Sequence, residues 1–86
     1  MFEVHLSTKA KKELEQLDEN LRNRIVKILG VLQLDPVPVR FYDVKKMVGV
    51  ENTYRIRIGK IRIIYTVIWK DKVVIVSKIG FRERVY

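Results

Sequence analysis

Arginines alternate with apolar residues along the segment 54–65, which reads Tyr-Arg-Ile-Arg-Ile-Gly-Lys-Ile-Arg-Ile-Ile-Tyr. Successive side chains of a strand point to opposite faces of a sheet, so this pattern predicts half-buried strands with Arg55, Arg57 and Arg62 on one face. A guanidinium group stays charged at any accessible pH and binds phosphate through paired hydrogen bonds. Such a face can bind a polyanion and stabilise the charge that develops on a reacting phosphate.

The Gly-Lys pair at 59–60 divides this segment into two strands. Glycine takes the positive φ that the first central position of a type II′ turn requires, so the pair predicts a tight hairpin. In that register Arg57 lies directly opposite Arg62. Like charges in opposing positions destabilise a sheet, so we interpret this pairing as a sign of function rather than of stability.

A further strand is expected over 73–81, after a three-residue turn. This register pairs Trp69 with Val73 and Ile63 with Ile79, whereas a two-residue turn would exchange the two faces of the strand. We prefer the three-residue turn because it places the cations together, away from the apolar face. It assigns Val73, Ile75, Ile79 and Phe81 to the core, and Val74, Val76, Lys78, Gly80 and Arg82 to the opposite face.

These strands together predict a cationic surface on one side of the sheet. We expect no acidic residue on this surface to compensate its positive charge. An ordinary solvated face is the alternative, since many antiparallel sheets have one polar side. The residues assigned to the surface are Arg55, Arg57, Arg62, Lys78 and Arg82, with Lys45 and Lys46 at its rim.

A helical hairpin is predicted before the basic segment. Apolar residues recur at spacings of three and four over 8–17 and 19–34, which indicates two amphipathic helices; one continuous bent helix is the alternative. Ser7 is suited to cap the first helix, and Asp18 or Asn20 the second. Their side-chain oxygens can accept a hydrogen bond from a free N–H of the first turn.

The order of the elements predicts the fold class. Residues 2–6 alternate as a first strand, and Pro36 and Pro38 end the second helix. We expect 35–46 to be an irregular or partly extended connection. The chain 1–86 is thus expected to be one α+β domain of the order β-α-α-β-β-β, with a helical hairpin packed on one face of an antiparallel sheet.

The chain is strongly basic and has few residues suited to metal or redox chemistry. Its 86 residues include 18 Lys and Arg against 10 Asp and Glu, and the net charge of +8 favours nucleic acid, an anionic membrane surface or an acidic protein as partner. The sequence has no cysteine and one histidine, which excludes disulfides, thiolate metal sites and a multi-histidine site within one chain. No apolar run of about 20 residues predicts a membrane span. We therefore expect a cytoplasmic protein with no membrane partner, no metal and no cofactor.

Other residues that could carry chemistry have structural interpretations. His5 lies in the first strand, far in sequence from the arginines, and is expected to be a structural or surface residue. Tyr65 and Trp69 alternate onto the apolar face and are expected in the core. Phe41 and Tyr42 in the connection suit either the core or stacking on a base.

Three runs follow one another in a characteristic order: Lys-Met-Val-Gly, then Tyr-Arg-Ile-Arg-Ile-Gly-Lys-Ile-Arg-Ile-Ile-Tyr-Thr-Val, then Val-Ser-Lys-Ile-Gly-Phe-Arg-Glu-Arg-Val-Tyr. In this order they resemble the RelE branch of the RelE/ParE toxin superfamily, and the resemblance covers nearly the whole chain. It implies the toxin of a type II toxin–antitoxin pair, a ribosome-dependent endonuclease that cleaves mRNA in the ribosomal A site by attack of a 2′-OH on the adjacent phosphate. It also implies a RelB-like antitoxin, through which the complex binds operator DNA.

The family's functional positions fall on the basic segments. Two positions that are lysines in the best-known family member correspond to Arg55 and Arg57. Arginine is a poor proton carrier because its pKa lies above about 12, so the candidates for the general base are Lys78, Tyr86 or a group of the ribosome. The catalytic set implied by the resemblance is Arg55, Arg57, Arg62, Arg82 and Tyr86, and Lys45, Lys46, Lys78 and Arg84 are assigned to RNA binding.

Two other functions are compatible with the sequence. One is a ParE-like toxin that inhibits gyrase without nuclease chemistry, and the other is a basic RNA-binding module without enzymatic activity. The presence of Arg57, Arg62 and Arg82 together favours the nuclease over the gyrase inhibitor.

Overall fold

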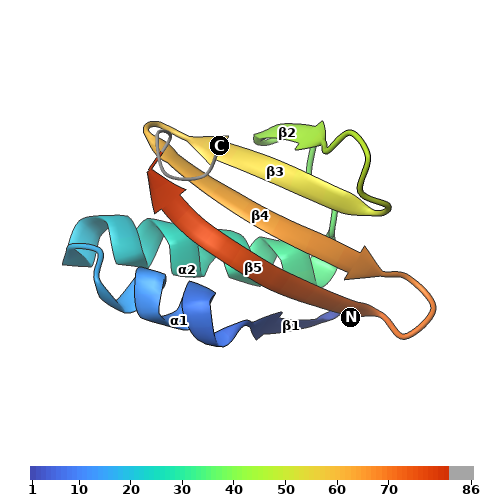
Figure 1. Cartoon of the computed structure of the whole chain (residues 1–86), viewed down its shortest axis with the longest axis horizontal. Coiled ribbons are helices and arrows are strands. Elements are labelled where there is room, and N and C mark those ends of the chain that lie inside the picture. The colour runs from blue at the N-terminus through green and yellow to red at the C-terminus, as the bar shows by residue number, and fades with distance from the viewer. Residues whose placement is uncertain (82–86) are drawn as a thin grey trace.

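The computed structural model describes residues 1–81 and forms a sheet covered on one side by two helices (Figure 1). The strand order is β1-β5-β4-β3-β2; β1 is parallel to β5 and the other neighbours are antiparallel. This confirms the α+β class and the helical hairpin on one face. The elements are β1 (Glu3–Leu6), α1 (Thr8–Glu15), α2 (Glu19–Leu34), β2 (Asp43–Lys46), β3 (Thr53–Ile58), β4 (Ile61–Ile68) and β5 (Val73–Phe81).

The helices begin at the predicted caps. The Ser7 hydroxyl accepts a hydrogen bond from the Ala10 N–H at 3.0 Å, and Asp18 Oδ1 accepts one from the Leu21 N–H at 2.9 Å. These bonds satisfy backbone donors that have no partner within the helix. The helices are therefore two separate elements, and Asp18 rather than Asn20 caps the second.

The connection after the helices contains a strand that the sequence prediction missed. Residues 43–46 form β2, which pairs with β3 so that Asp43 faces Arg57 and Lys45 faces Arg55. Four strands therefore follow the helices instead of three. The segment Asp-Val-Lys-Lys has one apolar residue, so it lacks the alternation that marks a strand. Charged side chains of this kind are typical of a sheet edge.

The predicted hairpin between β3 and β4 is confirmed. Arg57 pairs with Arg62 and Ile58 with Ile61. Gly59 has φ +57°, the sign expected at the first central position of a type II′ turn.

The predicted register of β5 is correct only in its second half. Ile63 pairs with Ile79 as expected, but the register shifts between Ile64 and Tyr65, and Tyr65 pairs with Val76 instead of Ser77. One extra residue on β5 forms a bulge. In the part of β5 that precedes the bulge, each side chain therefore points to the face opposite to the predicted one. A single turn length therefore could not describe both halves of the strand.

The bulge exchanges the predicted core and surface residues of the first half of β5. Val74 and Val76 are fully buried, although the prediction placed them on the surface, and Ile75 is 38% exposed, although it was predicted in the core. Phe81 and Trp69 were also predicted in the core but are partly exposed. Trp69 lies in the turn, outside the strand, and packs edge-to-face on Phe2 with ring centroids 5.7 Å apart.

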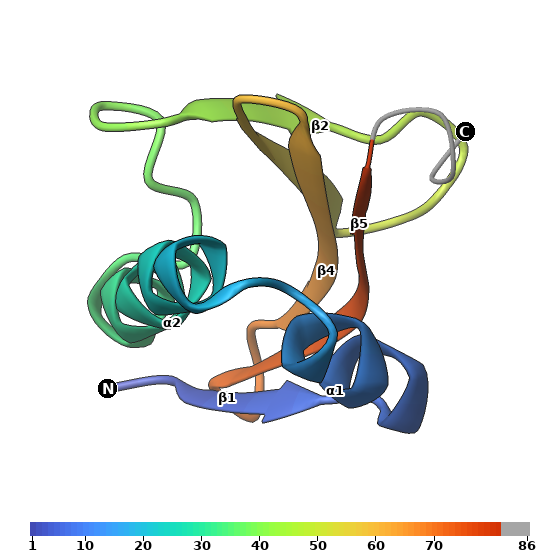
Figure 2. The ribbon, with the colours of Figure 1, turned by 90° about the vertical axis from the view of Figure 1, so that its left-hand side faces the viewer.

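The core lies between the helices and the inner face of β3, β4 and β5 (Figure 2). Tyr65 is fully buried in it and stacks on Tyr54 with ring centroids 5.8 Å apart, and its hydroxyl donates a 2.7 Å hydrogen bond to the Pro36 carbonyl. This bond ties β4 to the connection after α2. The largest fully buried aliphatic side chains are Ile25, Leu32, Ile56, Ile61, Ile63 and Ile79.

Tyr65→Phe is expected to lower the free energy of unfolding by about 1–3 kcal/mol, because it leaves the buried Pro36 carbonyl without a donor. Thermal denaturation followed by circular dichroism measures this loss. An unchanged melting temperature would show that the bond contributes nothing to stability.

Burial, with smaller effects from Tyr54 and Asp35, raises the pKa of the Tyr65 phenol above its ordinary value. In the unfolded chain the phenol ionises near a pH of about 10, whereas the folded chain keeps it protonated. Its contribution to stability is complete below that pH and is lost as the pH rises above it. The same denaturation series in alkaline buffers should show a steeper loss of stability for the wild type than for Tyr65→Phe.

Candidate nucleic-acid interface

The sheet brings four of the predicted cations together on the face opposite the helices. The pairing of strands places them in two neighbouring rows. Ile56, Ile63 and Ile79 point into the core, so the residues beside them in each strand point outward. We call Arg55, Arg57, Arg62 and Lys78 the cationic face. The first row contains Lys45, Arg55, Ile64 and Lys78, and the second contains Asp43, Arg57, Arg62 and Gly80.

The cationic face includes an acidic residue, contrary to the prediction. Asp43 of β2 forms ion pairs with the Arg55 Nη2 at 3.2 Å and with the Arg57 Nε at 2.8 Å. The sequence prediction missed this carboxylate because it treated its segment as irregular. The pairing orients both guanidinium groups and offsets part of the repulsion between the arginines.

Arg55 and Arg62 have an unusual environment for surface cations. The side chain of Arg55 is 13% exposed and Arg62 as a whole is 4% exposed. Arg62 Nη1 donates to the Gly59 carbonyl at 3.3 Å, but the Nε of each arginine has no hydrogen-bond acceptor within the described part of the chain. A buried donor without an acceptor is costly. An oxyanion placed against these groups would satisfy donors that are already desolvated.

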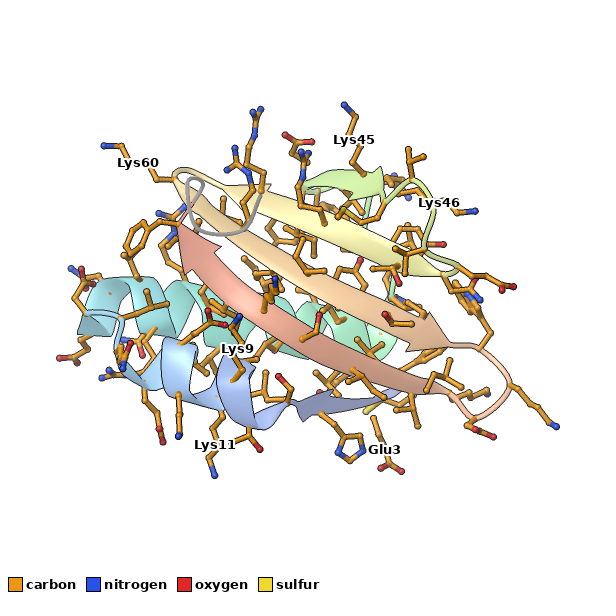
Figure 3. All side chains as sticks on the ribbon, in the orientation of Figure 1. Glu3, Lys9, Lys11, Lys45, Lys46 and Lys60 are labelled. Atoms are coloured by element: carbon orange, nitrogen blue, oxygen red, sulfur yellow. The ribbon has the colours of Figure 1, made fainter. Side chains whose placement is uncertain are left out.

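The two flanking lysines point to different sides of β2. Lys45 is in register with Arg55 and extends the first row, whereas Lys46 is in register with Tyr54 and belongs to the opposite side of the strand (Figure 3). The structure therefore does not bring Lys46 to the cationic face. Arg82, Arg84 and Tyr86, also predicted for the site, lie outside the described residues.

His5 is a surface residue, as expected. It lies in the edge strand β1, where its ring contacts the Glu3 carboxylate at 3.1 Å, and both side chains are largely exposed. In residues 1–81 no group of three or more His, Asp or Glu side chains is arranged to hold a metal ion. Neither helix in this part of the chain has the length and apolar character required to cross a membrane.

Glu13 of α1 holds the part of β5 that carries Lys78. Its Oε1 accepts a hydrogen bond from the Ile79 N–H at 2.9 Å. The pairing of β1 with β5 ends at Val76, so this N–H lies beyond the reach of a neighbouring strand on that side. The predicted helix gave no sign of this role, because Glu13 occupies an ordinary polar position of an amphipathic pattern.

Glu13→Ala is expected to lower the free energy of unfolding by about 1–3 kcal/mol, since it removes a hydrogen bond to a charged group. Glu13→Gln keeps an acceptor oxygen and should retain most of the stability. Chemical denaturation measures both. Glu15→Ala, at an exposed position of the same helix, is the matched control. Equal losses for Glu13→Ala and Glu15→Ala would contradict this role of Glu13.

The sequence of this chain matches a family of toxins. A profile of the family described as ParE toxin of type II toxin-antitoxin system, parDE, matches residues 4–86, so the chain belongs to this family. A curated protein of Methanocaldococcus jannaschii, provisionally named toxin RelE1, is 33% identical over 85 residues, which are 99% of this chain and 94% of that protein.

Solved structures show the same fold. A chain from the RelE–RelB complex of Pyrococcus horikoshii superposes with a TM-score of 0.86 at 34% identity, covering 98% of both chains. A chain from the RelBE toxin–antitoxin complex of E. coli has a TM-score of 0.83 at 26% identity, covering 98% of this chain and all of the other. These likenesses confirm the RelE-type fold that the sequence motifs implied.

Proposed function

We propose that this toxin is a ribosome-dependent endonuclease that cleaves mRNA in the ribosomal A site. The observation that carries the proposal is the pair of arginines Arg55 and Arg62, whose buried Nε groups lack acceptors within residues 1–81. The cationic face also has Arg57 half-exposed beside them. Together these groups suit the binding of one phosphate with charge spread over its oxygens.

In the proposed reaction the 2′-oxygen attacks the adjacent phosphorus, forming a 2′-O–P bond as the P–O5′ bond breaks. The 2′-OH loses its proton to a base, and the leaving 5′-oxygen takes up a proton. The products carry a 2′,3′-cyclic phosphate and a 5′-hydroxyl. Arg55, Arg57 and Arg62 stabilise the charge on the phosphorane and its oxygens.

Proton transfer requires a group other than these arginines. Among the described residues of the cationic face, Lys78 is the candidate, since it lies in register with Ile64 and in the same row as Arg55. Tyr86 and groups of the ribosome remain the other candidates. Asp43 competes with the substrate phosphate, because both seek Arg55 and Arg57. Catalysis in this proposal is mainly positioning and electrostatics, with the ribosome completing the site.

We also propose that a RelB-like antitoxin neutralises this toxin in the cytoplasm, and that the complex binds operator DNA through the antitoxin. The support is the composition of the similar solved assemblies, which are RelE–RelB complexes. The net charge of +8 suits an acidic partner.

Purified protein added to translating ribosomes tests the nuclease, with breaks in the mRNA mapped by primer extension. Cuts within codons that appear only during translation would support the proposal. Intact mRNA on translating ribosomes would contradict it, and the same mRNA without ribosomes is the control.

A second candidate is inhibition of gyrase, which the name of the matching family favours. A supercoiling assay with purified gyrase separates the two functions. Inhibition of supercoiling together with intact mRNA would establish the gyrase inhibitor. Salt-dependent binding of RNA without either effect would indicate a non-catalytic RNA-binding module.

A further inference from the structure

A cleft lies beside the cationic face, between α2, the connection after it and the β3–β4 turn. Its volume is about 460 Å³, within the range of roughly 300–1,000 Å³ that small-molecule sites occupy. Ile28 and Ile58 line it and are both buried, which gives the cleft an apolar floor. A flat apolar group can therefore rest in it out of water.

Three cations surround this apolar floor. Arg24 and Lys27 are exposed residues one turn apart on α2, so they share a face of that helix, and Arg57 contributes from β3. One acidic residue, Asp43, lines the cleft, and it is already paired with Arg55 and Arg57. The cleft therefore offers a net positive rim to an anionic group.

Aromatic surface completes the cleft. Phe41 and Tyr42 line one side, and Phe41 is 71% exposed. The guanidinium of Arg40 lies 5.9 Å from the centre of the Phe41 ring, a cation–π contact that orients the ring. An exposed aromatic ring beside cations is the arrangement on which proteins stack single-stranded bases.

We propose that this cleft binds one nucleotide of the RNA strand whose neighbouring phosphate lies on the cationic face. Its base stacks on Phe41 above the apolar floor, and Arg24 and Lys27 bind its phosphate. Arg57 lines the cleft and belongs to the cationic face, so it connects the two sites. The inference rests on the proposed function in that it extends the same RNA strand by one subsite.

The features of the cleft favour RNA over an acidic peptide. The cleft is continuous with the arginines that bind the phosphate, and an acidic peptide in the cleft would make no use of that connection. A neighbouring and more apolar groove is better suited to aliphatic side chains; it is lined by Val31, Leu34, Asp35, Phe41 and Tyr42. The peptide is therefore an outcome of the test and not part of the proposal.

The test is the binding of a fluorescein-labelled 12-nucleotide oligoadenylate RNA, followed by fluorescence anisotropy at several salt concentrations. For Arg24→Ala/Lys27→Ala we expect weaker binding and a shallower dependence of log affinity on log salt. At about 0.7 per neutralised phosphate in a single strand, losing the one phosphate that both cations bind should reduce the slope by about 0.7. Lys9→Ala/Lys11→Ala removes the same charge from α1 and should leave the slope unchanged (Figure 3).

Phe41→Ala should weaken oligoadenylate binding by roughly 5- to 100-fold without changing the salt slope, because stacking releases no counterions. Phe41→Tyr keeps the stacking surface and should bind as the wild type does. Both variants should melt at the wild-type temperature, since this side chain is mostly exposed.

Wild-type affinity and slope in both Arg24→Ala/Lys27→Ala and Phe41→Ala would overturn the inference. The inference would also be overturned if these variants lost affinity only for a labelled 12-residue peptide of alternating glutamate and leucine, because the cleft would then be a peptide site. The ribosome assay separates this failure from that of the proposed function. If the wild type cleaves mRNA on ribosomes and the variants bind oligoadenylate as the wild type does, the subsite is rejected and the nuclease is kept. If the variants bind oligoadenylate more weakly and the wild type cleaves no mRNA, the nuclease is rejected and the subsite is kept.

Discussion

Arg62→Ala is expected to slow ribosome-dependent mRNA cleavage by about 10²–10³-fold, the usual effect of removing one donor that stabilises a developing oxyanion. Arg62 is the most buried cation of the cationic face, at 4% exposure, and lies in register between Arg57 and Gly80. A donor in such a dry position acts on the phosphorane more strongly than one in water. The measurement is the single-turnover rate of cleavage on programmed ribosomes, with products resolved by primer extension.

The controls for Arg62 separate charge, geometry and folding. Lys60→Ala removes a nearby cation from the turn and should leave the rate within about twofold (Figure 3). Arg62→Lys keeps the charge but loses the planar set of donors, so we expect an intermediate rate. Arg62→Ala should remain folded, because the side chain makes one 3.3 Å hydrogen bond, to Gly59, within the described residues, and such a bond is worth about 1 kcal/mol. A folded variant that cleaves at the wild-type rate would remove Arg62 from the site.

Val74→Asp is expected to abolish cooperative folding or to lower the free energy of unfolding by roughly 4 kcal/mol or more, because it buries a carboxylate without a partner. Val74 is fully buried, whereas Ile75 next to it is 38% exposed. Ile75→Asp should therefore cost less than about 1 kcal/mol, within the range of ordinary surface substitutions. Urea denaturation of both variants gives the comparison.

This pair of variants tests the bulge in β5 directly. Without the bulge, the faces of the first half of the strand would be exchanged, and Ile75→Asp would be the destabilising change. That reversed order would contradict the register in which Tyr65 pairs with Val76. It would also separate Val74 from the core that it now shares with Tyr65 and Ile25.

Local patterns in the sequence were sufficient for most of the elements. The helix caps at Ser7 and Asp18, the Gly59 hairpin and the opposition of Arg57 to Arg62 depend on neighbouring residues and on turn geometry, and the structure confirms them. The family motifs added the RelE-type fold. The catalytic roles of Arg55, Arg57 and Arg62 stay predictions.

The failures occurred where pairing with another strand decides the outcome. Residues 43–46 carry one apolar side chain and become a strand because β3 offers them a free edge. The bulge at Ser77 is bonded by residues from elsewhere in the chain, since the Ser7 hydroxyl donates to the Ser77 carbonyl at 3.2 Å and the Ser77 hydroxyl donates to the Ile64 carbonyl at 3.3 Å. Neither contact leaves a periodic signal in its own segment, so no pattern along the chain could indicate it.

The alternation along 54–65 was enough to show that arginines share one face of a basic hairpin, because side-chain direction in a strand follows from its period of two. How those arginines are held depends on the tertiary structure. It placed the Asp43 carboxylate between Arg55 and Arg57, buried Arg62, and left Lys46 on the other side of β2. Desolvation and ion pairing depend on which strands become neighbours, and residues far apart in the chain set that arrangement.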